Sequence, residues 1–226
     1  MQKHIDEFSE SRETVFERIA QLGIVPVVII EHVERALPLA RALFAGGLPI
    51  VEITFRTDAA AEVIRIISRE RPQMLVGAGT LLTQANVEAA KASGAAFGVS
   101  PGLNPATVNH ARELGLPFIP GISTASEIEI GLSLGCKLLK FFPAEALGGP
   151  AMIDAVWGPF KHVGVRFMPS GGITTANLEK YLRAASVAAA GGTWIARPED
   201  LAEGNWAGIQ ERARLAVELV ARSRRV

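Results

Sequence analysis

Residues 117–142 read PFIPGISTASEIEIGLSLGCKLLKFF and contain one complete strand–helix–strand unit. The short apolar runs at 117–120 and 137–142 are typical of strands that are buried on both faces. Between them, 124–134 has helical periodicity, with Ser123 and Thr124 before it as capping hydroxyls and Gly135 after it as a stop. This unit predicts two parallel strands joined by a crossover helix.

The same alternation runs along the whole chain. Further strands are predicted at 24–30, 49–55, 74–77, 96–99, 165–169 and 187–190, and further helices at 32–45, 58–71, 83–93, 105–114, 149–158, 175–184 and 198–222. Eight strand–helix units favour an α/β fold of the closed (β/α)8 TIM barrel type over an open doubly wound sheet. An extra amphipathic helix is predicted near 9–22, and Thr57-Asp58 is predicted to cap the helix at 58–71. No linker interrupts the pattern, so we expect residues 1–226 to form a single barrel domain.

Composition excludes several classes of protein. The 226 residues are 49% hydrophobic with a formal net charge of zero, so no single-signed field points to nucleic acid. No apolar run is long enough to cross a membrane, and the charged N-terminus lacks the apolar segment of a signal peptide. Cys136 is the one cysteine and the four histidines are scattered, so we expect no disulfide and no metal site. A cytoplasmic protein is the expectation.

Lys140 is the least expected residue of the segment quoted above, because it lies inside an apolar strand. Burial disfavours an ammonium and lowers a lysine pKa by roughly 3 to 5 units. An uncharged amine is a nucleophile that can form a Schiff base with a carbonyl. The alternative is a lysine whose ammonium reaches water from the end of the strand. Lys137 has the opposite parity and is predicted to be solvated.

Glu52 is the second candidate, in the strand that reads VEITFRT over 51–57. Alternation places Glu52, Thr54 and Arg56 on one face, which we expect to be the barrel interior. A carboxylate there is costly unless it is paired or used in chemistry. The alternative is a structural ion pair of Glu52 with Arg56 or Lys140.

Glycine-rich strand ends predict where a ligand binds. Ser170-Gly171-Gly172 follows the seventh strand and Gly191-Gly192-Thr193 the eighth, the usual phosphate-binding corner of such barrels. Tight turns are the alternative. The third strand ends in Gly77-Ala78-Gly79-Thr80, where the glycines would let a ligand approach the backbone. Thr80 would either bind that ligand or cap the following helix.

Seven motifs, in order and in register, resemble those of the 2-keto-3-deoxy-6-phosphogluconate aldolases, a family that also covers 4-hydroxy-2-oxoglutarate aldolase activity. The resemblance extends from about residue 14 to about residue 220. The motifs are EITFRT (52–57), VGAGT (76–80), SPG (100–102), IPGIST (119–124), KFFPAE (140–145), GGI (171–173) and GGTW (191–194).

The resemblance implies a class I aldolase that cleaves the phosphorylated keto acid into pyruvate and glyceraldehyde 3-phosphate, a step of the Entner–Doudoroff pathway. It implies that Lys140 is the Schiff-base lysine and that Glu52 is the general acid/base, acting through water. Members of this family are typically homotrimers that need no metal or other cofactor. The resemblance also implies that Arg56 and Thr80 bind the pyruvate carboxylate and that Pro101 and Phe142 shape the pocket. It implies that the phosphate is bound by Ser170, Gly171, Gly172, Gly191, Gly192 and Thr193.

Two substitutions distinguish this chain from the usual pattern of the family. Family members often have threonine at the position of Ser170 and serine at that of Thr193, so the hydroxyls are kept. An enzyme of the same mechanism that prefers the galactonate epimer or unphosphorylated 4-hydroxy-2-oxoglutarate is one alternative. A phosphosugar-binding barrel without catalysis is another, although binding alone needs no uncharged amine.

Overall fold

The computed structural model describes residues 15–224. A helix over 15–22 comes first. The strands that follow are β1 (Ile24–Val28), β2 (Ile50–Thr54), β3 (Leu75–Gly79), β4 (Phe97–Val99), β5 (Phe118–Ile119), β6 (Gly121–Ile122), β7 (Leu138–Phe141), β8 (Arg166–Pro169) and β9 (Ala190–Gly192). The helices are η1 (Val33–Arg35), α2 (Ala36–Ala45), α3 (Ala60–Glu70), α4 (Gln84–Ala92), α5 (Pro105–Glu113), α6 (Ala125–Ser133), α7 (Gly149–Trp157), η2 (Gly158–Val163), α8 (Leu178–Leu182), α9 (Pro198–Glu203) and α10 (Trp206–Ser223).

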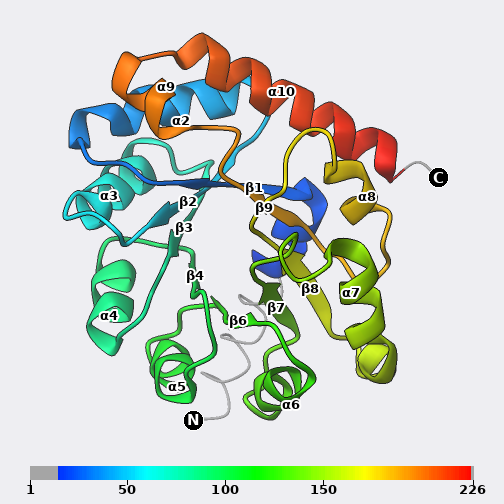
Figure 1. The fold of residues 1–226 in the computed structure, drawn as a ribbon. Coiled ribbons are helices and arrows are strands. Elements are labelled where there is room, and N and C mark those ends of the chain that lie inside the picture. Colours follow the sequence, from blue (N-terminus) through cyan, green and yellow to red (C-terminus); the bar gives the residue numbers. More distant parts are fainter. Residues whose placement is uncertain (1–14, 225–226) are drawn as a thin grey trace.

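The strands form a ring of parallel neighbours with helices around it (Figure 1). One sheet has the order β5-β4-β3-β2-β1-β9 and a second has the order β6-β7-β8. Every pair of neighbours is parallel, as a crossover helix after each strand requires. The predicted α/β barrel is therefore confirmed.

Pro120 interrupts one strand of the ring and divides the ring into two sheets. Pro120 lies between β5 and β6, where the ladder with β4 ends at Ile119, and it has no N–H to donate toward β7. Its carbonyl still accepts a hydrogen bond from the Lys140 amide at 2.9 Å, and the ladder with β7 begins at Gly121. On the other side, parallel bridges Phe167–Val187 and Ser170–Gly191 connect β8 to the β9 segment. The interrupted strand and these bridges close the ring.

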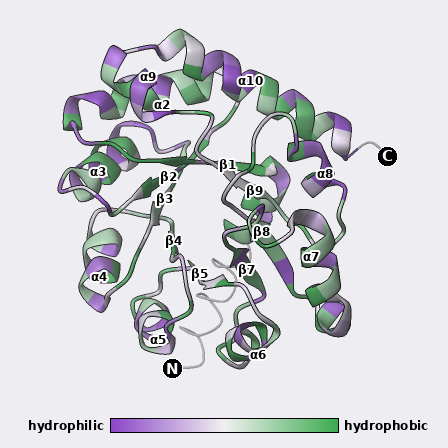
Figure 2. Ribbon diagram, in the orientation of Figure 1, coloured by the Kyte–Doolittle hydropathy of each residue, from purple (hydrophilic) through white to green (hydrophobic). Residues whose placement is uncertain are grey.

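Apolar side chains fill the space between the strands and the helices. Coloured by hydropathy, the strands are mainly green, whereas the helices carry both green and purple residues (Figure 2). Phe141 and Phe167 point outward from adjacent strands and meet edge to face, with ring centroids 6.3 Å apart. This burial fixes the parity of each strand, because a shift by one residue would turn the apolar side chains inward. No helix in residues 15–224 is long and apolar enough to cross a membrane.

The bounds of the eighth strand and the cap of α3 differ from the prediction. The eighth strand is Ala190–Gly192 and not 187–190, because its ladder with β1 pairs Gly191 with Val25 and Gly192 with Pro26. The cap of α3 is not Thr57-Asp58, because the Thr57 hydroxyl donates to the Ile30 carbonyl at 2.6 Å. The predicted leading helix is confirmed over 15–22, and residues 9–14 lie outside the described residues.

The predicted helix 198–222 is divided into α9 and α10. Gly204 has φ +71°, a left-handed conformation that ends α9, and the Asn205 side chain accepts from the Gly208 amide to cap α10. Asp200 binds this junction together. Its carboxylate accepts hydrogen bonds from Asn205, the Arg197 amide and the Arg212 guanidinium.

Replacement of Asp200 by Ala is expected to lower the free energy of unfolding by about 2 to 4 kcal/mol, because it leaves Arg212 without its buried partner. Burial raises the pKa of Asp200, but its bonds to Arg212 and the Arg197 amide outweigh burial and hold the pKa below the ordinary value of 3.8. The contribution of ionised Asp200 to the free energy of unfolding is therefore complete above pH 3.8, and it is lost as pH falls through the folded-state pKa. Urea denaturation of Asp200→Ala at neutral and acidic pH measures both effects. Exposed Glu211→Ala on α10 is the control, and equal stability of the two variants would contradict the prediction.

Candidate active site

Lys140 and Glu52 face each other across the interior of the ring. Lys140 is on β7 and Glu52 on β2, with β3, β4 and the interrupted strand between them on one side. Lys140 Nζ lies 3.5 Å from Glu52 Oε1. Lys140 is 7% exposed and Glu52 is 0% exposed. The prediction of two buried, inward-facing ionisable groups is confirmed, and the alternative in which the ammonium reaches water is wrong.

Gly79 sets the position of the Glu52 carboxylate. Glu52 is paired in register with Gly77, yet its side chain leans two residues along β3 and covers Gly79. A Cβ built on Gly79 would lie 2.1 Å from Glu52 Oε1, so no larger residue fits there with Glu52 in place. The lean carries the carboxylate toward the C-terminal ends of the strands, where such barrels hold their chemistry.

One oxygen of the Glu52 carboxylate is left without a partner. Oε1 contacts Lys140, whereas Oε2 is buried and accepts no hydrogen bond from the described residues. A buried acceptor left unpaired costs about 1 to 3 kcal/mol, so a purely structural ion pair would be expected to satisfy it. A carboxylate with a spare acceptor beside an amine is suited to receive a proton from a bound molecule.

Phe142 and Pro101 lie next to this pair. The Phe142 ring centroid is 5.7 Å from Lys140 Nζ, within the range of a cation–π contact. Pro101 reaches the same region through Gly121, which is paired in register with Lys140 on the adjacent strand. A Cβ on Gly121 would lie 2.1 Å from the Pro101 carbonyl oxygen, so glycine is what allows that approach.

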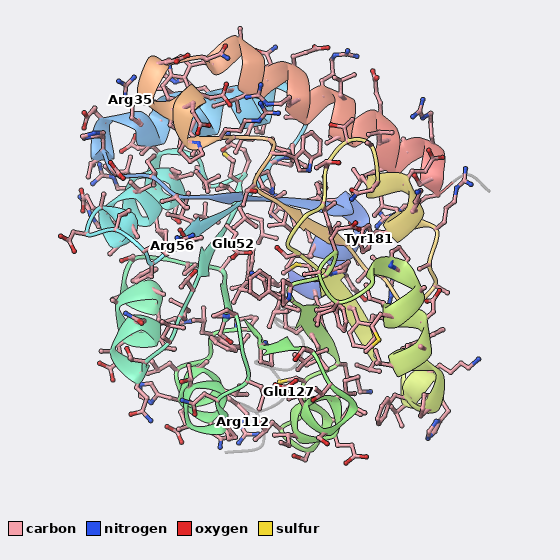
Figure 3. The ribbon with its side chains drawn as sticks, in the orientation of Figure 1. Arg35, Glu52, Arg56, Arg112, Glu127 and Tyr181 are labelled. Atoms are coloured by element: carbon pink, nitrogen blue, oxygen red, sulfur yellow. The ribbon has the colours of Figure 1, made fainter. Side chains whose placement is uncertain are left out.

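Thr80 and Arg56 follow the ends of β3 and β2. Thr80 has φ +57° and is the one non-glycine residue among the described residues with positive φ, a strained conformation for a β-branched side chain. It does not cap the next helix, because Thr83 does. Arg56 is exposed beyond the strand end and lines a hollow of about 390 Å³ together with Asn86. Glu52 lies toward the centre of the ring and Arg56 farther out (Figure 3), so the alternation does not extend to Arg56.

The two glycine pairs meet at one corner. Ser170 is buried and pairs with Gly191 across the bridge, and a Cβ on Gly191 would lie 3.0 Å from the Ser170 hydroxyl. Gly171 and Gly172 have φ +96° and +81° and form a turn whose backbone N–H groups donate no hydrogen bond within residues 15–224. Phe142 connects this corner to Lys140, because a Cβ on Gly171 would lie 3.2 Å from its ring.

The second glycine pair differs from the prediction. Gly191 and Gly192 are strand residues of β9, not a loop after it, and exposed Thr193 follows them. Gly192 faces outward, where a Cβ would lie 2.6 Å from the Trp194 indole nitrogen. Of the two glycines, Gly191 is therefore the one that lies at the corner with Ser170.

The glycines of β3 were also misread from the sequence. We predicted that they admit a ligand, but a Cβ on Gly77 would meet the Phe97 ring at 2.2 Å, and Gly79 accommodates Glu52. Sequence reasoning also missed Glu145 and Tyr181, which hold the loop between β7 and α7. Their sequence signals are the place of Glu145 at the end of the KFFPAE motif and the fact that Tyr181 is the single tyrosine of the chain.

Comparison with known proteins identifies relatives over nearly the whole chain. The sequence profile of the KDPG and KHG aldolase family matches residues 15–212. The 2-dehydro-3-deoxy-phosphogluconate aldolase of Treponema pallidum is 44% identical over 207 residues, which are 92% of this chain and 98% of that protein.

Two solved structures have the same fold. The KDPG aldolase of Legionella pneumophila, with pyruvate captured as a covalent carbinolamine intermediate, has a TM-score of 0.85 and 38% identity, covering 91% of this chain and 97% of that one. The 2-keto-3-deoxy-6-phosphogluconate aldolase of Zymomonas mobilis with 3-phosphoglycerate has a TM-score of 0.81 and 38% identity, covering 89% and 94%.

Replacement of Gly79 by Ala is expected to displace the Glu52 carboxylate from Lys140 and to destabilise the fold by about 1 to 3 kcal/mol through overpacking. Urea denaturation measures the loss, and a crystal structure of the variant locates Glu52. Gly102→Ala is the matched control, because a Cβ there has no atom within 4 Å. Wild-type stability with Glu52 unmoved would show that the contact at Gly79 does not constrain the carboxylate.

Proposed function

The chain belongs to the KDPG and KHG aldolase family, and on that premise we propose that it cleaves 2-keto-3-deoxy-6-phosphogluconate into pyruvate and glyceraldehyde 3-phosphate. It is a carbon–carbon lyase of class I, which uses a lysine Schiff base. The observation that carries this proposal is the buried contact between Lys140 Nζ and Glu52 Oε1. We further propose that residues 1–226 form one domain, that three copies assemble, and that the enzyme works in the cytoplasm.

Lys140 starts the reaction. Its amine must be uncharged to attack, and the Glu52 carboxylate is close enough to take the proton from Nζ. The amine nitrogen adds to the C2 ketone to give a carbinolamine. Glu52 gives its proton to the carbinolamine hydroxyl, which leaves as water, so that an iminium forms and Glu52 is again a carboxylate. The iminium then withdraws the electron pair of the C3–C4 bond.

Glu52 completes the cleavage. Its carboxylate removes the proton of the C4 hydroxyl, directly or through a water, as the C4 oxygen becomes the aldehyde of glyceraldehyde 3-phosphate. The electrons of the broken bond leave an enamine on Lys140. Return of a proton to C3 gives the pyruvate imine, and hydrolysis releases pyruvate and the free lysine. The spare Oε2 supports this role, because a second acceptor is ready for the incoming proton.

The two ends of the substrate are assigned to different loops. Thr80 and Arg56 would bind the pyruvate carboxylate, while Pro101 and Phe142 shape the pocket beside Lys140. The phosphate would bind the N–H groups of Gly171 and Gly172 and the hydroxyls of Ser170 and Thr193, with Gly191 and Gly192 in the adjacent strand. The strained backbone of Thr80 and the unused donors of the glycine turn support these assignments.

A second substrate is favoured by the family profile, which covers aldolases for KHG as well as KDPG. 4-Hydroxy-2-oxoglutarate has the same reacting centre but no phosphate. The Lys140–Glu52 pair would cleave it in the same way, with the glycine corner left unused.

Borohydride reduction in the presence of pyruvate is expected to inactivate the enzyme and to leave a reduced pyruvyl group on Lys140, because the imine forms there. Peptide mass spectrometry locates the group. The matched control is Lys137→Ala, which removes the exposed lysine three residues away and should be labelled like the wild type. Labelling of another residue, or none, would refute the assignment of Lys140.

Replacing Ser170 by Ala or Thr193 by Val is expected to raise KM for the phosphorylated substrate by about tenfold per lost hydroxyl. Turnover of 4-hydroxy-2-oxoglutarate should stay unchanged, because that substrate has no phosphate and its distal carboxylate is attached directly to C4. Steady-state kinetics with both substrates measure the contrast. An equal loss on both would place these hydroxyls outside the phosphate site.

A further inference from the structure

The glycine turn Gly171–Gly172 is held by its carbonyl groups. The Glu145 amide donates to the Gly171 carbonyl at 3.0 Å, and the Asn177 side chain donates to the Gly172 carbonyl at 3.0 Å. Beside them, the Ala144 amide donates to the Ser170 carbonyl at 2.8 Å. With the carbonyls fixed in this way, the N–H groups of the turn are left for an anion.

Glu145 also brings a negative charge to this turn. A Cβ on Gly172 would lie 2.6 Å from the Glu145 Cβ and 2.7 Å from its Cγ, so the side chain runs directly over the glycine. Glu145 is exposed, and within residues 15–224 it forms no ion pair with a lysine or arginine. A carboxylate that turned toward the free N–H groups would compete with and repel a phosphate there.

Tyr181 holds that carboxylate by a hydrogen bond. Tyr181 is a fully buried residue of α8 (Figure 3), and its phenol donates a hydrogen bond to Glu145 Oε1. A Cβ on Gly149 would lie 3.4 Å from both of these oxygens, so the start of α7 closes over the contact. Burial raises the pKa of Tyr181 above its ordinary value, and the bond to Glu145 and its charge raise it further, so the phenol stays a donor at working pH.

We propose that the Tyr181–Glu145 hydrogen bond determines specificity for phosphorylated substrates, by keeping the Glu145 carboxylate turned toward α8 and away from the glycine turn. The inference rests on the proposed function and deepens it. Both are positioning residues, since neither is placed to touch the reacting carbons. The bond acts on one end of the substrate and leaves the Lys140–Glu52 pair untouched.

Two variants separate this electrostatic role from a merely structural one. Tyr181→Phe keeps the buried ring and frees the carboxylate, whereas Glu145→Gln keeps an oxygen that accepts from the phenol and removes the charge. In the double variant the phenol is lost but no charge is freed. Glu179→Gln is the matched control, because Glu179 also lies on α8 but is paired with Arg183 on the surface.

The experiment measures KM and kcat of the four variants on 2-keto-3-deoxy-6-phosphogluconate and on 4-hydroxy-2-oxoglutarate. Tyr181→Phe is expected to raise KM for the phosphorylated substrate about tenfold, the scale of one charge-assisted hydrogen bond, with kcat kept. In the double variant, KM for the phosphorylated substrate is expected to return to the wild-type value. In Glu145→Gln, that KM is expected to equal the wild-type value or to fall below it. Loss of activity on both substrates, or no rescue by the double variant, would overturn the proposal.

Calorimetric titration with inorganic phosphate tests the same idea without turnover. Binding is expected to weaken in Tyr181→Phe and to recover in the double variant. If phosphate binding follows this pattern across the variants but the wild type cleaves neither substrate, the proposed function fails and the inference about Glu145 stands. If the wild type binds no phosphate, the inference fails whatever the activity.

The single tyrosine of the chain supplies a spectroscopic check. Its ionisation is followed by the ultraviolet absorbance of the phenolate. Glu145→Gln is expected to lower the pKa of Tyr181, because the charge that raises it is removed while burial remains. An unchanged titration would show that the two groups do not interact in solution.

Discussion

The rest of this fold has to hold a carboxylate and an amine in contact with each other inside a ring of strands. Two charges taken out of water are costly, and their attraction compensates for that cost only in good geometry. At 3.5 Å, with one carboxylate oxygen unpaired, the Lys140–Glu52 contact is not the geometry that stability alone would favour. The ring holds it because each group is on a strand whose parity is fixed by apolar packing on the outer face. Gly79, which has no side chain, then leaves the space that the carboxylate occupies.

Much of this arrangement could be predicted from periodicity. Alternation in 51–57 and 137–142 identified Glu52 and Lys140 as inward-facing, and the count of strand–helix units gave a closed barrel that places them opposite each other. The parity rule succeeds because burial on one face leaves a strand no second register. It failed at Arg56, where the strand has already ended and the backbone turns.

What could not be predicted depends on contacts between distant segments. The sequence GAG over 77–79 does not show whether its glycines make room for a ligand or for another side chain. In the structure they make room for Phe97 and Glu52, which lie on the neighbouring strands. The eighth strand begins later than its apolar run suggests, because pairing with β1 and not hydrophobicity sets its position. Gly204 and Asn205 divide the last helix by local chemistry that periodicity overlooks.

The two halves of the proposed site lie on different kinds of structure. Lys140 and Glu52 are on strands, where the ladder and the core allow little movement, while the glycine turn and Glu145 are on loops held by a few hydrogen bonds. Changes at Ser170, Thr193 or Glu145 can therefore alter what is bound at the far end without moving Lys140 or Glu52. Phe142 contacts both halves, through Lys140 on one side and Gly171 on the other. Under the proposed function, a substrate that binds at both halves would lie beside the Phe142 ring.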